Sequence, residues 1–118
     1  MLKTIPDLLE SIPFTIRKLD AISACQECVD NNGLRIDVRE PEEAANTPIK
    51  GSINIPRGLL EMRMLNEYPQ ADKAIYVHCA TGARATLSAE QLMRIGYENV
   101  TVISCALDII QDAAEAHA

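Results

Sequence analysis

The chain has 118 residues, a usual size for one domain, and 47% of them are apolar. A chain of this length buries roughly two-thirds of its unfolded surface, so we expect a globular protein with a sizeable core. One Phe and no Trp make that core aliphatic. The formal net charge of −6 argues against nonspecific binding to nucleic acid or to anionic membranes, since both need a basic face.

The N-terminal segment does not resemble a signal peptide. Pro6, Asp7 and Glu10 stand where an apolar stretch would be required. No run in the chain approaches the roughly 20 apolar residues of a membrane span. We therefore expect a cytoplasmic protein whose thiols stay reduced, and we do not interpret its four cysteines as a disulfide framework.

The first half of the chain predicts helices that alternate with strands. The expected elements are a helix over residues 4–11, a strand over 14–19, a helix over 24–30, a strand over 34–38 and a helix over 40–45. Thr4 and Ser23 are expected to cap the first two helices, and Pro41 suits the first turn of the third. The acids around Pro41 are interpreted as a solvated helix start.

The second half continues the same alternation. Its expected elements are a short strand within residues 51–56, a helix over 57–68, a strand over 73–78, a helix over 83–95, a strand over 99–104 and a helix over 106–116. This pattern predicts an α/β fold with a mostly parallel sheet. We expect one domain over residues 1–118, with an N-terminal helix and strand in 1–22 and a helical tail in 104–118.

The stretch "IYVHCATGAR" (Ile75–Arg84) has the clearest chemistry. A run typical of a central parallel strand ends at Cys79, and small residues lead from there into a helix. Ligands bind beyond the carboxyl ends of strands in such a sheet, which places Cys79 at the binding edge.

Free backbone amides and the positive end of the helix dipole gather where this helix begins. Gly82 permits the positive φ that a nest of inward-pointing amides needs, and Arg84 adds a permanent charge. We expect this field to favour the nucleophilic thiolate of Cys79 and to hold an anionic substrate against it.

This segment resembles the active-site loop of the rhodanese (thiosulfate sulfurtransferase) family. Cys79, two variable residues, Gly82, one variable residue and Arg84 follow that pattern, and His78 before the cysteine also fits. Three further blocks resemble the family in the same order: Leu34–Glu43, Lys50–Leu60 and Met93–Ile103. The similarity therefore extends over most of the chain, from about Ser23 to Ile103.

The resemblance implies a rhodanese-like five-stranded, mostly parallel sheet with helices on both faces. It also implies a ping-pong reaction in which catalytic Cys79 takes a sulfane sulfur from thiosulfate or another donor. Cys79 would hold that sulfur as a persulfide and pass it to cyanide, a thiol or a protein sulfur acceptor. The substrate-binding loop would be Ala80, Thr81, Gly82, Ala83 and Arg84, with no cofactor, metal, nucleic acid or membrane involved.

Loop length favours sulfur transfer over phosphate hydrolysis. Four residues separate Cys79 from Arg84, whereas the similar loop of cysteine phosphatases has five and opens wider for tetrahedral phosphate. Two segments depart from the rhodanese pattern. Residues Thr47–Ile49 lack the family's histidine, and "SCALDII" (Ser104–Ile110) replaces its Gly-Gly pair and Trp, which puts ordinary thiosulfate turnover in question more than the fold.

Two other functions stay open. The altered Ser104–Ile110 segment suits a rhodanese-like binding or sensing module with little turnover. Cys105 lies in that segment, so it is either a small apolar residue at a strand end or the partner of Cys79 in a redox switch.

The remaining candidates have competing structural interpretations. Arg57 is either a substrate contact or a solvated helix-start residue, and Arg39 is either a second such contact or part of a structural pair with Asp37. Cys25 and Cys28 form a C-x-x-C that is interpreted as core packing, because both fall inside a helix and no second pair completes a zinc site. His78 is interpreted as buried and hydrogen-bonded rather than catalytic.

Overall fold

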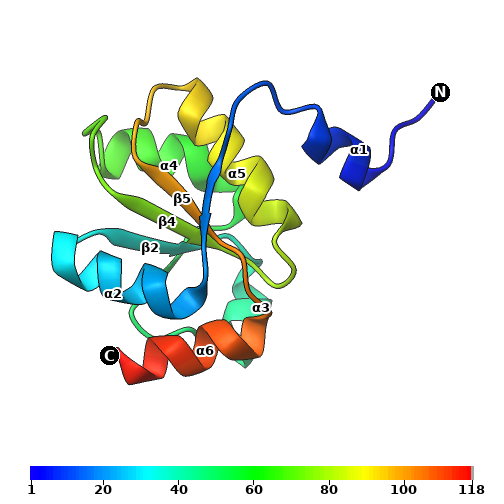
Figure 1. Ribbon diagram of the computed structural model, residues 1–118. Helices are drawn as coiled ribbons and strands as arrows, with labels where there is room; N and C mark the ends of the chain where they lie inside the picture. Colours follow the sequence, from blue (N-terminus) through cyan, green and yellow to red (C-terminus); the bar gives the residue numbers. More distant parts are fainter. Residues whose placement is uncertain (118) are drawn as a thin grey trace.

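The computed structural model describes residues 1–117 and contains a five-stranded sheet with helices on both faces (Figure 1). The strands are β1 (Arg17–Leu19), β2 (Leu34–Asp37), β3 (Ile53–Asn54), β4 (Ile75–His78) and β5 (Val100–Ile103). Their order is β1-β5-β4-β2-β3, and each neighbouring pair is parallel. The expected α/β class is confirmed, and the sheet is parallel throughout rather than mostly so.

The helices separate into two layers. They are α1 (Ile5–Glu10), α2 (Ala21–Asn31), α3 (Pro41–Asn46), α4 (Leu60–Glu67), α5 (Ala83–Arg94) and α6 (Leu107–Ala116), with a 3₁₀ turn, η1 (Arg57–Leu59), before α4. Figure 1 shows α4 and α5 over one face of the sheet and α2 with α6 against the other. The last residue of the expected tail, residue 118, lies outside the described residues. Among the residues described, no helix is long and apolar enough to cross a membrane.

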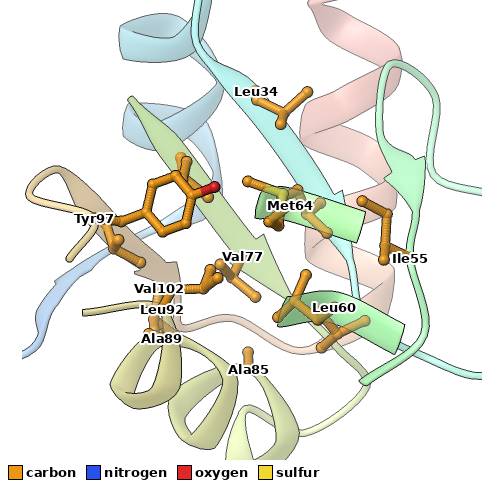
Figure 2. Close-up of a cluster of buried hydrophobic side chains, with 14 of the residues drawn as sticks. Leu34, Ile55, Leu60, Met64, Val77, Ala85, Ala89, Leu92, Tyr97 and Val102 are labelled. Atoms are coloured by element: carbon orange, nitrogen blue, oxygen red, sulfur yellow. The ribbon is translucent and has the colours of Figure 1, made fainter. Parts of the chain in front are cut away.

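Strand alternation divides the core into two clusters. Figure 2 shows Leu60 and Met64 of α4 and Leu92 of α5 packed toward Val77 and Val102 of the sheet. The alternate strand residues point to the opposite face, where they meet α2 and α6. The sheet is therefore buried on both sides, as the near-continuous apolar runs of its central strands predict.

Two element boundaries differ from the expectation. The first strand begins at Arg17 rather than at residue 14, because its only neighbour is the short β5 and pairing starts at Arg17 with Thr101. Helix α2 is capped by Asp20 and not by Ser23. Ser23 is instead the donor, since its N lies 2.8 Å from Asp20 Oδ1, and the carboxylate directly after β1 starts the helix three residues earlier. The Thr4 cap of α1 is confirmed.

Candidate active site

Cys79 stands at the carboxyl end of β4, where the chain leaves the sheet and turns into α5. It continues the alternation of Ile75 and Val77, so it projects to the α5 face, and it is 1% exposed. Gly82 precedes α5 with a φ of 98°, a left-handed conformation that residues with a Cβ adopt only at a cost. The expected positive φ at this junction is therefore confirmed.

Two backbone amides at the start of α5 donate hydrogen bonds to the Cys79 sulfur. Gly82 N lies 3.1 Å and Ala85 N lies 3.3 Å from Cys79 Sγ. Amides in this position have no carbonyl partner within the helix, and the helix dipole adds partial positive charge around them. The Gly82 carbonyl in turn accepts from Thr86 Oγ1 at 2.7 Å. The loop is thus held in a shape that directs main-chain donors at one sulfur atom.

Arg84 is paired with a carboxylate from another helix. Arg84 Nη1 lies 2.6 Å from Glu43 Oε1, and Nη2 lies 3.0 Å from Oε2, so two parallel hydrogen bonds join α5 to α3. The guanidinium, together with the Glu40 amide, lowers the pKa of Glu43 to about 2. Both side chains are more than one-third exposed, so water screens the pair and its contribution to stability is about 1 kcal/mol or less.

Arg39 belongs to a buried structural pair. Its Nη2 lies 2.7 Å from Asp37 Oδ2, and both side chains are almost completely buried. It also donates to the Thr47 carbonyl at 2.7 Å, which ties α3 to the end of β2. Since Asp37 and Arg39 alternate with Val38 of the α5-side cluster, they project away from the face that carries Cys79. The structural interpretation of Arg39 is therefore confirmed.

Arg57 of η1 forms an ion pair with Glu61 of α4. Arg57 Nη1 lies 2.7 Å from Glu61 Oε1, one helical turn further along. The residue lines a cavity between α1 and α5 of about 400 Å³ that does not include the Cys79 loop. The structure does not bring Arg57 to the site.

A groove of about 480 Å³, here called the loop groove, opens beside the Cys79 loop. It is lined by Leu9, Lys18, Ala80–Ala83, Thr86, Val102 and Ser104–Ala106. The segment that replaces the family's Gly-Gly pair therefore borders the loop. Cys105 lies in this lining, and its Sγ accepts a hydrogen bond from Ala21 N at 3.2 Å.

His78 is buried on the face opposite Cys79. Its Nε2 and Ser52 Oγ are hydrogen-bonded at 2.7 Å, and its Nδ1 has no partner among the described residues. Burial lowers the pKa of His78 to about 4, so the ring is neutral at pH 7. The interpretation of His78 as a buried, hydrogen-bonded residue is confirmed.

Cys25 and Cys28 pack in the cluster between α2, α6 and the sheet. Cys25 Sγ accepts a hydrogen bond from Arg35 Nη1 at 3.0 Å, and Cys28 Sγ donates to the Gly33 carbonyl at 3.1 Å. Their assignment to the core is confirmed. Within residues 1–117, no three His, Cys, Asp or Glu side chains come together in a way that could hold a metal ion.

Three residues near the site were missed or misjudged from sequence. The expected donor loop ended at Arg84, but the structure shows that Ala85 N also donates to the Cys79 sulfur. This donor could have been predicted, because the first amides of a helix have no carbonyl partner within it. Glu43 lies in the expected solvated start of α3, but the pairing of its carboxylate with Arg84 was not predicted. No sequence signal could have found that pair or the place of Lys18 in the loop groove, since both depend on which strands are neighbours.

A sequence model for the rhodanese-like domain matches residues 20–112. This chain belongs to the rhodanese family. Its rhodanese-like region includes Cys79, α5 and the Cys105 segment. The resemblance noted from the four sequence blocks is therefore confirmed.

Relatives of this rhodanese family member include two proteins named as sulfurtransferases. A sulfurtransferase of Allochromatium vinosum is 31% identical over 86 residues, which cover 72% of this chain and 78% of that protein. The thiosulfate sulfurtransferase PspE of Escherichia coli is 32% identical over 65 residues, which cover 55% of this chain and 62% of that protein.

Among solved structures, a Rhodopseudomonas palustris protein superposes with a TM-score of 0.78 at 24% identity, covering 96% of this chain and 92% of its own. That protein is described as one of unknown function and a possible tyrosine phosphatase. At this identity the similarity shows a shared fold alone.

Proposed function

We propose that this protein is a thiosulfate sulfurtransferase-like enzyme that carries a sulfane sulfur on Cys79. The observation that carries the proposal is the pair of α5 amides, from Gly82 and Ala85, directed at Cys79 Sγ. Donors in this position stabilise negative charge on a sulfur nucleophile. The names of the two curated relatives support the same class of reaction.

In the first half-reaction, the Cys79 thiolate attacks the outer sulfur of thiosulfate. A bond forms between the two sulfurs while the sulfur–sulfur bond of thiosulfate breaks, and its electron pair leaves with sulfite. Cys79 then holds a persulfide anion, and the total charge is unchanged. The loop from Ala80 to Arg84 and the amide of Ala85 would stabilise that anion at the positive end of α5.

In the second half-reaction, an acceptor thiolate or cyanide attacks the outer sulfur of the persulfide. The new bond forms on the acceptor, the bond to Cys79 breaks, and its electron pair returns to the Cys79 thiolate. No side chain needs to transfer a proton when the acceptor arrives as an anion. This agrees with the position of His78, which is neutral and lies on the other face of the sheet.

The test is the intact mass of the protein after incubation with thiosulfate. We expect one added sulfur atom, located on Cys79 by peptide mapping and removed by cyanide. Cys79→Ser should gain no sulfur, whereas Cys105→Ser, the matched control for a second thiol near the loop groove, should gain it normally. Failure of the unmodified protein to gain sulfur from thiosulfate or any other sulfane donor would refute the proposal.

A redox switch between Cys79 and Cys105 is the second candidate, because Cys105 lines the loop groove beside Ala80–Ala83. A peroxide would remove two electrons and two protons from the two thiols, form one disulfide and be reduced to water. Peptide mapping after mild peroxide treatment should then recover the two residues as one linked fragment. Two free thiols after this treatment would exclude the switch.

The rate of the second half-reaction distinguishes an enzyme from a binding or sensing module with little turnover. Rapid turnover with cyanide or a thiol that Cys79→Ser abolishes would exclude the module. A persulfide that forms and is not passed on would favour it. The cytoplasmic location and the protein sulfur acceptor stay predictions.

A further inference from the structure

Lys18 of β1 is a charged residue at the loop groove that none of the functions above uses. Of the described residues that line the groove, Lys18 alone carries a charge. The remaining lining consists of apolar side chains, hydroxyls, the Cys105 thiol and the backbone of the loop. The charge of the groove is therefore opposite in sign to the formal net charge of the chain, which is −6.

The fold explains why the Lys18 side chain reaches the Cys79 side of the sheet. Lys18 pairs in register with Val102, and Val102 belongs to the cluster on the α5 face. Its strand neighbours Arg17 and Leu19 alternate to the other face, where Arg17 pairs with Glu27 of α2. Lys18 therefore shares the groove with Thr86, in the first turn of α5.

The ammonium of Lys18 is available to a ligand. It takes part in none of the ion pairs found among residues 1–117. Two arginines considered for substrate binding are already paired, Arg84 with Glu43 and Arg57 with Glu61. The flexible stem of a lysine lets its charge follow a small anion within a groove of about 480 Å³.

We propose that Lys18 is a specificity-determining residue that binds the oxyanion end of anionic sulfane donors while their outer sulfur faces Cys79. This inference rests on the proposed sulfurtransferase function and names the substrate class of that site. The N-terminal end of α5 and the Lys18 ammonium would then attract the same anion from two elements. Compounds with more negative charge at the oxyanion end should benefit most.

The test compares Lys18→Gln and Lys18→Arg with the unmodified protein, using thiosulfate and the singly charged methanethiosulfonate as donors. Lys73→Gln is the matched control, because Lys73 precedes the amino end of the central strand β4, whereas Cys79 follows its carboxyl end. We expect Lys18→Gln to raise KM for thiosulfate about three- to fivefold, as for a charge interaction at an exposed side chain, with kcat nearly unchanged. The increase in KM should be smaller with methanethiosulfonate as the donor. Lys18→Arg and Lys73→Gln should both keep a KM for thiosulfate close to that of the unmodified protein.

A second measurement separates this inference from the proposed function. Titration of Cys79→Ser with thiosulfate, with and without Lys18→Gln, reports binding without any sulfur transfer. Equal Kd values in the two proteins, or no binding in either, would overturn the role of Lys18 even if Cys79 forms a persulfide. A Kd that is about three- to fivefold weaker with Lys18→Gln would support it even if the unmodified protein gains no sulfur.

Discussion

Replacing Gly82 with Ala should damage the site through backbone conformation alone. Gly82 has a φ of 98°, and a Cβ added there would meet no atom within 4 Å. The substitution therefore causes no clash, and its cost is the left-handed backbone of an L-residue, about 1–2 kcal/mol in the free energy of unfolding. Relaxation of φ would rotate the Gly82 amide away from Cys79 Sγ, which now lies 3.1 Å from it.

Two other glycines provide matched controls. Gly96 has a φ of 116° and open space around a built Cβ, but it lies beyond the far end of α5. Gly58 also has open space and does not have a positive φ. We expect Gly96→Ala to lose as much stability as Gly82→Ala with normal activity. Gly58→Ala should lose neither stability nor activity.

Urea unfolding at pH 7 measures the stabilities, and the rate of persulfide formation with thiosulfate measures activity. One misdirected amide at an anion site should slow Gly82→Ala about ten- to a hundredfold. Full activity in Gly82→Ala, or equal activity losses in Gly82→Ala and Gly96→Ala, would refute the idea that the positive φ of Gly82 directs the amide donors at Cys79 Sγ.

Two further predictions concern charge and pH. Glu43→Gln should release the Arg84 guanidinium from its carboxylate and thereby lower KM for thiosulfate. The free energy of unfolding should decrease by about 1 kcal/mol or less. An unchanged or higher KM would contradict this prediction. His78 should make folding sensitive to acid, because its folded pKa of about 4 lies below the ordinary 6.5 and the unfolded chain therefore binds the proton first. The free energy of unfolding should fall by up to about 3 kcal/mol between pH 6.5 and pH 4. Urea unfolding at the two pH values should show that His78→Gln lacks this decrease. Equal decreases in the two proteins would contradict a buried neutral ring.

Local sequence was sufficient for most of the fold and for the centre of the site. Alternating strands and helices predicted the α/β class, since apolar periodicity, capping residues and glycine stops act within a few positions. The same local chemistry placed Cys79 before Gly82 at a strand–helix junction. The errors in the fold lie at element boundaries such as the start of α2, where two capping side chains, Asp20 and Ser23, stand three residues apart and Asp20 accepts from the Ser23 amide.

Contacts between distant segments were decided by tertiary structure. Glu43 meets Arg84 because α3 follows β2, and β2 is the sheet neighbour of β4. Lys18 lines the same groove as Ala80–Ala83 because β1 pairs with β5 in a register that sets it beside Val102. Strand order and register follow from burying both faces of the whole sheet at once, so no short stretch of sequence contains them. The sequence by itself predicted Cys79 and the main-chain donors around its sulfur, and the assembled sheet decided which charged side chains lie near them.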